Sequence, residues 1–254
     1  MKRDAPIILK TPGDIEKLRK SNLIAAGILR ILKDRVLPGI TTMDLERVAE
    51  EELEKRKARA AFKGYMGYPF CLCASVNEEI VHGMPSSKKV LKEGDIIGLD
   101  FGVLCDGFYG DAAITVGVGA ISAEAGRLIE VTERCLEEAI DKARIGNRLY
   151  DISHAVQSRA EGEGFSVVRA FVGHGIGRSL HEPPQVPNFG SLGKGELLRE
   201  GMVLAIEPMI NQGVYQVRIL EDGWTAVTAD GKLSAHFEHS VAITKDGPMV
   251  LSRL

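Results

Sequence analysis

The chain has 254 residues, which is enough for one large domain or two small ones, and 44% of them are hydrophobic against 26% charged. This is the composition of an ordinary globular protein with enough apolar material for a core. A net charge of −3 argues against a strong basic field that would attract nucleic acid or an anionic membrane.

The N-terminal residues and the hydropathy pattern predict a cytoplasmic protein with no membrane partner. Residues 1–6 begin basic but lack the apolar stretch of a secretory signal. No apolar run reaches the ~18 residues that a membrane span requires. A chain of this size does not need disulfide staples, so four cysteines are expected to be free thiols in a reducing compartment: Cys71, Cys73, Cys105 and Cys135.

Two helices and then four strands are predicted in the first half of the chain. The run TPGD at residues 11–14 marks a helix start, with Thr as the N-cap and Pro at the first helical position. This helix is expected to reach about Val36, and Thr42 is predicted to cap a second helix that ends near Lys57. The strands expected after it are Cys71–Val76, Ile80–His82, Ile96–Phe101 and Ala112–Val116.

The second half of the chain repeats this order. Ser122 is predicted to cap a helix that ends near Arg144, and a further helix is expected over Tyr150–Glu163. The strands expected after them are Val167–Phe171, Val203–Ile206, Trp224–Val227 and Phe237–Ile243. Helices first and strands second, twice over, predict an α+β fold in which two helix pairs cover a curved, mostly antiparallel sheet.

Two windows of the sequence recur at one offset of 107 residues. Residues 39–45 (GITTMDL) match residues 146–152 (GNRLYDI), and residues 93–100 (EGDIIGLD) match residues 200–207 (EGMVLAIE). Two matches in the same order at one offset indicate duplicated halves, about residues 10–117 and 118–250. With only two copies, we expect one pseudo-twofold catalytic domain over residues 1–254 rather than a solenoid.

The repeat also relates carboxylates to one another. Asp100 and Glu207 are equivalent, and each ends an aliphatic strand, where a carboxylate is costly to desolvate unless it is paired or binds a cation. Asp111 and Glu238 begin or precede the next strand of each half, so two symmetric hairpins are expected to converge four carboxylates on one centre. Such a cluster would repel itself without cations, and two divalent ions remove the problem. For each carboxylate taken alone, the alternative is a strand-end salt bridge.

A glycine-rich stretch at residues 172–184 supplies histidines. His174 lies between two glycines, which permit close packing against a metal centre. Carboxylate oxygens with one imidazole suit Mn, Fe, Co or Zn in an open hydrolytic site. After His181, Pro183 and Pro184 rule out the helix of an H-E-x-x-H zinc motif. His82, at the end of a predicted strand, is a second candidate, with a purely structural role as its alternative.

These stretches closely resemble one family over nearly the whole chain, the methionine aminopeptidases of the short, type I form. The most specific stretches are NEEIVHG at 77–83, LDFG at 99–102 with YGDA at 109–112, GHGIG at 173–177, AIEP at 205–208 and FEH at 237–239. The resemblance implies the pita-bread fold. It also implies removal of the N-terminal methionine from nascent polypeptides, with a preference for a small second residue.

Carried over residue by residue, the resemblance implies a centre of two metal ions with five ligands: Asp100, Asp111, His174, Glu207 and Glu238. Asp111 and Glu238 would bridge the ions, and Glu207 would accept a proton from the attacking water. His82 and His181 would contact the scissile amide and the tetrahedral intermediate.

The resemblance also implies a pocket for the methionine side chain, lined by Tyr65, Tyr68, Cys73 and Trp224. Plain core packing is the alternative for these four residues. Phe62 is larger than the residue usual at its place, and Leu180 stands where family members often carry Phe. These two departures leave the shape of the pocket open.

Two other functions remain as alternatives. A proline-directed peptidase of the same fold usually carries an additional N-terminal domain, whereas the first helix here is expected to start by residue 12. A non-catalytic binding protein of this fold would lose metal ligands, and all five are present. The basic run at residues 55–59 (KRKAR) is a candidate for transient contact with ribosomal RNA, although such a run at a helix end is usually a solvated face. A monomer is expected.

Overall fold

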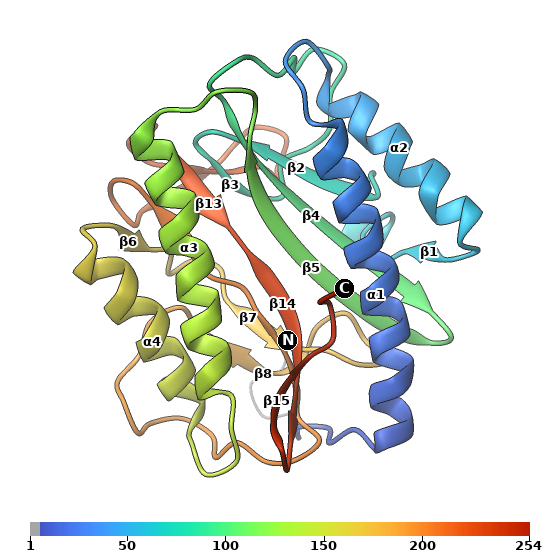
Figure 1. Cartoon of the computed structure of the whole chain (residues 1–254), viewed down its shortest axis with the longest axis vertical. Coiled ribbons are helices and arrows are strands. Elements are labelled where there is room, and N and C mark those ends of the chain that lie inside the picture. Colours follow the sequence, from blue (N-terminus) through green and yellow to red (C-terminus); the bar gives the residue numbers. More distant parts are fainter. Residues whose placement is uncertain (1–5) are drawn as a thin grey trace.

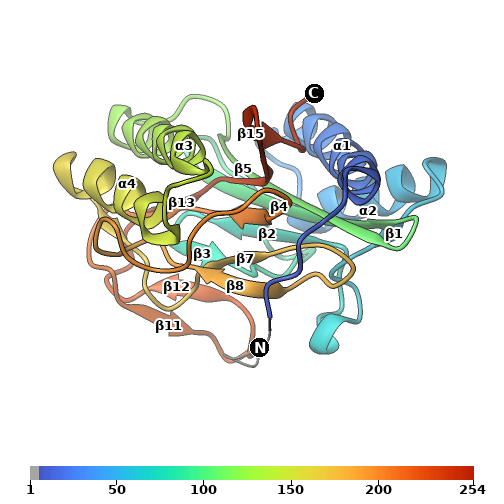
Figure 2. The ribbon, with the colours of Figure 1, turned by 90° about the horizontal axis from the view of Figure 1, so that it is seen from below.

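The computed structural model describes residues 6–254 and confirms the expected α+β architecture, with two helix pairs on one face of a large curved sheet (Figure 1). Turned by 90°, the helices lie along the upper side of the sheet, and the short strands β11 (Val217–Ile219) and β12 (Ala226–Thr228) lie on its lower side (Figure 2). The expectation about the N-terminal signal falls mostly on residues 1–5, outside the described part. No helix within residues 6–254 is long and apolar enough to cross a membrane.

Four long helices form the two pairs: α1 (Pro12–Arg35), α2 (Thr42–Lys55), α3 (Ala123–Lys142) and α4 (Leu149–Gly162). Thr11 and Ser122 cap α1 and α3 as predicted. The cap of α2 is Thr41 rather than the predicted Thr42, because Asp44 lies three residues after Thr41 and completes a capping box with it. The Thr41 hydroxyl accepts the N–H of Asp44 at 3.2 Å, and the Asp44 carboxylate accepts the N–H of Thr41 at 2.9 Å.

The large sheet runs in the order β1-β4-β5-β14-β9-β7-β8, with β2 paired to β4 and β15 paired to β14. These strands are β1 (Arg59–Ala60), β2 (Leu72–Val76), β4 (Ile96–Cys105), β5 (Phe108–Gly117), β7 (Gly173–Gly175), β8 (Glu182–Val186), β9 (Val203–Ile206), β14 (Glu238–Thr244) and β15 (Gly247–Val250). Every strand pairing within residues 6–254 is antiparallel.

Two three-stranded sheets complete the fold, in the orders β13-β10-β6 and β11-β12-β3. Their strands are β3 (Glu79–Val81), β6 (Ser166–Val167), β10 (Met209–Asn211), β11 (Val217–Ile219), β12 (Ala226–Thr228) and β13 (Ser234–His236), and one 3₁₀ turn covers Tyr65–Gly67. The strand expected over Val167–Phe171 is thus only two residues long. The strands β7 and β8 were not predicted, because short segments rich in Gly or Pro carry no alternating pattern.

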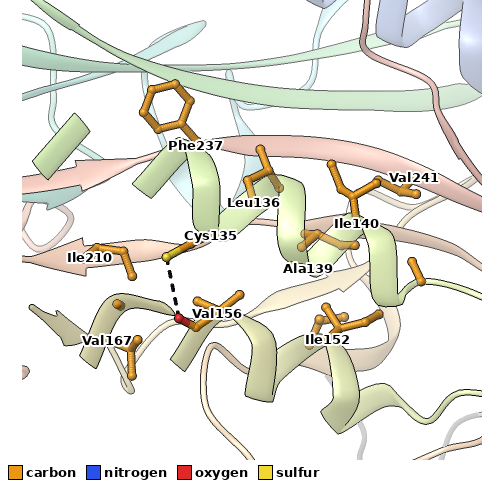
Figure 3. Close-up of a cluster of buried hydrophobic side chains, with 14 of the residues drawn as sticks. Cys135, Leu136, Ala139, Ile140, Ile152, Val156, Val167, Ile210, Phe237 and Val241 are labelled. Carbon is orange, nitrogen blue, oxygen red and sulfur yellow. Dashed lines mark hydrogen bonds between the residues drawn. The ribbon is translucent and has the colours of Figure 1, made fainter. Parts of the chain in front are cut away.

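Alternating side chains separate the two faces of the sheet. Leu99 and Phe101 pack into the core beneath α1 and α2, so Asp100 between them lies on the opposite face. In the second half, α3 and α4 cover a core that includes Val241 of β14 and Ile210 of β10 (Figure 3). The thiol of Cys135 lies inside this core, 3.6 Å from the carbonyl oxygen of Val156.

The two halves repeat the same backbone hydrogen bonds 107 residues apart. The N–H of Thr42 donates to the carbonyl of Lys89 at 3.0 Å, and that of Leu149 donates to Glu196 at 2.8 Å. A second matched pair joins Leu91 to Ile40 at 2.8 Å, and Leu198 to Asn147 at 2.9 Å. The predicted duplication is therefore confirmed in the structure.

Candidate metal centre and substrate pocket

The strand register of the first half aligns candidate residues on the face of the sheet away from the helices. Cys73 stands opposite Asp100, Asp100 opposite Ala113, and Ala113 opposite Glu238. Asp111 lies two positions before Ala113 and therefore on the same face. Three carboxylates from three neighbouring strands thus share one row.

The second half extends this row from the other side. His174 stands opposite Ala205, and Ala205 stands opposite Ser240, which lies two positions after Glu238. Glu207 follows Ala205 by two positions and also shares the face. All five candidate ligands therefore lie on one face, although the chain separates them by more than a hundred residues.

Two glycines allow β7 to enter this row. A Cβ atom on Gly173 would lie 2.3 Å from the carbonyl oxygen of Ala205, and one on Gly175 would lie 2.3 Å from that of Pro183. The glycines around His174 are thus required by close contact with the strands on either side. The two glycines thus allow close packing against backbone carbonyl groups of the neighbouring strands, whereas the sequence analysis expected packing against a metal centre.

One cavity of about 250 Å³ receives all the side chains that the sequence singled out. Its lining includes Tyr65, Tyr68, Cys73, His82, Asp100, Asp111, His174, His181, Glu207, Trp224 and Glu238, together with Phe62, Met66 and Leu180. No lysine or arginine of residues 6–254 appears in this lining. The lining thus combines four carboxylates and three imidazoles with several aromatic rings.

The four carboxylates of the cavity would be strongly destabilised if all of them were ionised without a cation. Burial raises the pKa of Asp100 to about 7. Burial first, and then the neighbouring carboxylates, raise the pKa of Asp111 and Glu238 well above the usual range. The pKa of Glu207 is raised in the same way by burial and by Asp100. These carboxylates would need a cation to ionise together at neutral pH.

The donor set fits divalent ions. Buried oxygens of Asp100, Asp111 and Glu238 have no hydrogen-bond partner. Ligand atoms of Asp111, His174 and Glu238 all lie within 4.8 Å of one another. Orphaned buried oxygens around one point are unfavourable unless an ion binds there. Carboxylates with one imidazole are a suitable ligand set for Mn, Fe, Co or Zn.

His174 is held in the tautomer that a ligand requires. Its Nδ1 lies 2.9 Å from the carbonyl oxygen of Gly175, which can only accept, so the proton is on Nδ1. Nε2 then carries a lone pair, and it lies 3.6 Å from Oε1 of Glu207. Burial and the neighbouring His181 lower the pKa of His174 to about 3, so the ring is neutral.

His181 and His82 also line the cavity. Nδ1 of His181 lies 2.8 Å from the hydroxyl of Tyr65, and its ring stacks beside His174 at a centroid distance of 4.2 Å. His82 meets Phe171 edge-on at 5.3 Å, and burial lowers its pKa to about 4.

The backbone delivers His82 into the cavity at some cost. Its φ of 60° lies in the left-handed region, which costs about 1–3 kcal/mol for a residue with a side chain. A Cβ on Gly83 would lie 2.5 Å from the carbonyl oxygen of Ala74, so only glycine fits beside β2 at that position. The chain is thus turned sharply at the end of β3, and His82 points to the substrate side.

Aromatic rings form the apolar part of the cavity lining. Trp224 packs edge-on against Tyr68 at 5.1 Å, and the Tyr68 hydroxyl lies 3.0 Å from the carbonyl oxygen of Leu72. Tyr68 therefore presents its ring rather than its hydroxyl to the cavity. Cys73 is buried beside Asp100, and burial raises the pKa of its thiol, so it offers a neutral surface.

Sequence reasoning missed two groups that position the cavity walls. Asp222 accepts the N–H groups of Trp224 and Thr225, each at 2.8 Å, and thereby fixes the turn that carries Trp224. Lys10 and Glu182 form a buried ion pair of 2.6 Å, which ties the N-terminal segment to the residue after His181. An Asx turn ahead of Trp224 was the available signal for Asp222. A charge pair 172 residues apart has no local signal.

His236 was also missed. Its buried Nε2 has no partner and lies 3.8 Å from Oε2 of Glu207. It stands opposite Met209, as Asp111 stands opposite Gly102 in the first half. The register-equivalent of Glu238 is Ala113, so the two hairpins do not place all four carboxylates symmetrically, contrary to the sequence expectation.

A second acidic group, Glu46 and Glu50 beside Cys71, also brings ligand-type atoms together. Its carboxylates already have partners. Glu46 accepts the N–H groups of Cys71 and Leu72 at 2.8 and 2.9 Å, and Glu50 pairs with Lys63 at 2.6 Å. Unlike the cavity carboxylates, this group needs no cation.

A family model, a curated relative and a crystal structure each match most of the chain. The model of metallopeptidase family M24 matches residues 16–245. The chain is 54% identical to a methionine aminopeptidase of Clostridium perfringens, over 97% of this chain and 98% of the relative. A crystal structure of methionine aminopeptidase from Thermotoga maritima superposes with a TM-score of 0.97 at 48% identity, covering 98% of this chain and all of that one.

A more distant likeness shows the fold alone. The prolidase of Pyrococcus horikoshii superposes with a TM-score of 0.78 at 20% identity. The match covers 97% of this chain and 63% of the prolidase. The pita-bread fold expected from the sequence is therefore confirmed, and it is shared by peptidases of different specificity.

Proposed function

The chain belongs to metallopeptidase family M24, and on that premise we propose that it removes the N-terminal methionine from polypeptides with two divalent metal ions. The observation that carries the proposal is one cavity lined by four carboxylates, an imidazole with a free lone pair and several aromatic rings. The full-length relatives named methionine aminopeptidase favour this activity over others of the same fold.

We assign the five candidate ligands to the ions: Asp100, Asp111, His174, Glu207 and Glu238. Bridging by Asp111 and Glu238 is supported by their central place in the row and by their orphaned oxygens. When bound, the ions supply a water that ionises near pH ~7 and positive charge for a developing oxyanion. Co, Fe, Mn and Zn all suit this donor set.

Three residues of the chain then move or donate protons. Glu207 accepts the proton of the attacking water, because burial and the neighbouring Asp100 raise its pKa and so make it a stronger base than an ordinary carboxylate. The Tyr65 hydroxyl donates a hydrogen bond to Nδ1 of His181, so the proton of this imidazole is on Nε2. The Nε2–H group then donates a hydrogen bond to the developing oxyanion. His82, which also lines the cavity, donates a hydrogen bond to the scissile amide.

The aromatic end of the cavity binds the methionine side chain. Tyr65, Tyr68 and Trp224 present ring surfaces to a thioether, and each sulfur–aromatic contact contributes about 0.3–1.5 kcal/mol. Cys73, which stands opposite Asp100 on the neighbouring strand, also lines this pocket. Phe62 and Leu180 fall into one buried cluster with these residues, so a larger and a smaller side chain than usual lie in the same wall.

A small second residue is favoured by the wall around His82. The left-handed backbone and the edge-on contact with Phe171 fix this imidazole, so a bulky side chain next to the scissile bond cannot push it aside. A proline-directed activity of the same fold is not favoured, because the full-length relatives are named methionine aminopeptidase and the prolidase likeness speaks for the fold alone.

Peptide hydrolysis tests the proposal directly. Released methionine is measured with Met-Ala, Met-Gly and Met-Lys peptides, an Ala-Pro peptide, and an N-acetylated Met-Ala control that lacks the free amine. We expect rapid release from the first two, slow release from Met-Lys, and none from the last two. Equal rates on all three methionine peptides, or release of the residue before proline, would contradict the assignment.

We also propose that residues 1–254 act as one catalytic domain, since both halves contribute to the single cavity. The proposed setting is a monomer in the cytoplasm that acts on nascent chains, with transient ribosome contact through residues 55–59. Lys55 and Arg56 of that run already pair with Glu52, so the ribosome contact is weakly supported by charge.

A further inference from the structure

His236 is a buried polar side chain that the proposed reaction does not use. It is 3% exposed, and its Nε2 has no hydrogen-bond partner. Burying an unsatisfied donor is unfavourable, so such a group calls for an explanation. The nearest charged atom is Oε2 of Glu207, at 3.8 Å.

The strand register aims this imidazole at the metal centre. Across the break at Glu207-Pro208, β10 and β13 continue the same register as β9 and β14, with Met209 opposite His236 and Ile206 opposite His239. His236 lies two positions before Glu238 and shares its face of the sheet. It occupies the place that Asp111 occupies in the first half.

The backbone of His236 is fixed from the first half. The hydroxyl of Thr115 on β5 accepts the N–H of His236 at 2.9 Å and donates to its carbonyl oxygen at 2.7 Å. Thr115 is itself buried. This reciprocal pair holds His236 at the junction of the halves, so the imidazole has little freedom apart from rotation of its ring.

The two oxygens of Glu207 face different imidazoles. Oε1 lies 3.6 Å from Nε2 of His174, and Oε2 lies 3.8 Å from Nε2 of His236. The lone pair of His174 faces the candidate metal position, as its hydrogen bond to Gly175 requires. A lone pair on His236 would repel the carboxylate, so a neutral His236 places its proton on Nε2.

We propose that His236 is a positioning residue that donates a hydrogen bond from Nε2 to Oε2 of Glu207 and leaves Oε1 for the ion. The inference rests on the metal centre proposed above. At 3.8 Å the pair is about 1 Å too far apart for a hydrogen bond, and a small rotation of the Glu207 side chain closes the gap. Partners of this kind orient ligating carboxylates and typically change metal affinity by about 10–100-fold.

Calorimetric titration of the metal-free protein with Co²⁺ tests the proposal. The variants are His236→Leu, which removes the donor, and His236→Gln, which keeps an N–H donor at similar reach. His154→Leu is the control for loss of one imidazole, since His154 is only partly buried on α4, lies outside the cavity lining and bonds only to Ser158 among the described residues. The thermal midpoint of each metal-free variant is measured beside the titration.

We expect His236→Leu to bind Co²⁺ about 10–100-fold more weakly, with the number of ions per chain unchanged. His236→Gln should recover most of the affinity, and His154→Leu should match the wild type. The metal-free midpoint of His236→Leu should not fall, because the unpartnered nitrogen is gone.

Two results would overturn the inference. Wild-type affinity in His236→Leu would show that the imidazole does not act on Glu207. Loss of one whole ion from His236→Leu, without recovery in His236→Gln, would make His236 a direct ligand instead. A wild-type protein that binds no Co²⁺ would overturn the metal centre itself, so the two failures are distinguishable.

Discussion

The two hairpins that meet at the candidate metal centre have the same pairing pattern but differ in continuity. In the first half, β4 and β5 pair without a break from Ile96 to Cys105. In the second half, the corresponding ladder is interrupted at Glu207-Pro208, and β9–β14 and β10–β13 lie on either side of the break. Proline has no N–H to donate, so the ladder cannot be completed there.

This difference separates two kinds of site residue. The unbroken hairpin supplies only carboxylates, Asp100 and Asp111, fixed by strand pairing on both sides. The second half supplies Glu207 at the break, Glu238, and the imidazoles of His174, His181 and His236. The first hairpin therefore contributes two carboxylates held by unbroken strand pairing, whereas the second half contributes two carboxylates and three imidazoles around an interrupted ladder.

The largest expected effect comes from removing a carboxylate of the first hairpin. Asp111→Ala removes a proposed bridging ligand, so metal content should fall and activity should drop by at least the ~10³-fold seen for loss of an oxyanion donor. The metal-free thermal midpoint should not decrease, since one repelling carboxylate is removed. Metal analysis, peptide hydrolysis and circular dichroism check this. Full metal content and full activity in the variant would show that the site is misplaced.

The second prediction separates the imidazoles within the second half. His174→Ala should weaken metal binding, and excess metal should restore part of the rate. His181→Ala should keep its metals and lose kcat by ~10²–10³, the range for one donor to a developing oxyanion. Calorimetry and steady-state rates on both variants decide the matter. If His181→Ala loses metal, or if the two variants behave alike, the two roles are assigned wrongly.

The third prediction compares the equivalent carboxylates Asp100 and Glu207 without metal. Burial raises the pKa of both, to about 7 for Asp100, so the folded state retains protons that the unfolded chain has lost above pH ~4. These groups therefore reduce stability as the pH rises from ~4 through 7. Asp100→Asn and Glu207→Gln should each raise the metal-free thermal midpoint more at pH 8 than at pH 5.

Saturating metal should reverse this trend in the wild type, because ions bind the ionised carboxylates and their affinity rises with pH. Thermal melts at both pH values, with and without metal, provide the comparison. Variants that shift the midpoint equally at pH 5 and pH 8 would show that neither carboxyl is protonated in the metal-free fold.

The smallest expected effect distinguishes the two halves at matched helix starts. Thr41 and Arg148 both precede a helix and have the same backbone contact with an Asp three residues later, but only the Thr41 side chain caps its helix. Thr41→Ala should cost about 1 kcal/mol, or a fall of roughly 2–4 °C in the thermal midpoint. Arg148→Ala should leave the midpoint nearly unchanged. Equal shifts in the two variants would contradict a side-chain cap at Thr41.

Much of the fold followed from local patterns in the sequence. Thr11 and Ser122 cap helices as expected because a short polar side chain before an apolar stripe is a local signal. The repeat at 107 residues predicted the duplicated architecture. Strands of three residues or fewer were missed or misplaced, because an alternating pattern needs more length to be recognised.

The sequence by itself determined which residues gather at the cavity, through the repeat and the resemblance to a family. The face of the sheet on which Asp100 lies became clear only from the packing of Leu99 and Phe101 beneath the helices. Only the tertiary structure decided that Glu238 stands opposite Ala113 and that His236 faces Glu207. The register between β5 and β14, strands more than a hundred residues apart, depends on how the two halves of the large sheet pack beneath their helix pairs. No local sequence pattern encodes this register. A slip of one residue in the pairing would nevertheless turn every side chain of the strand to the other face of the sheet.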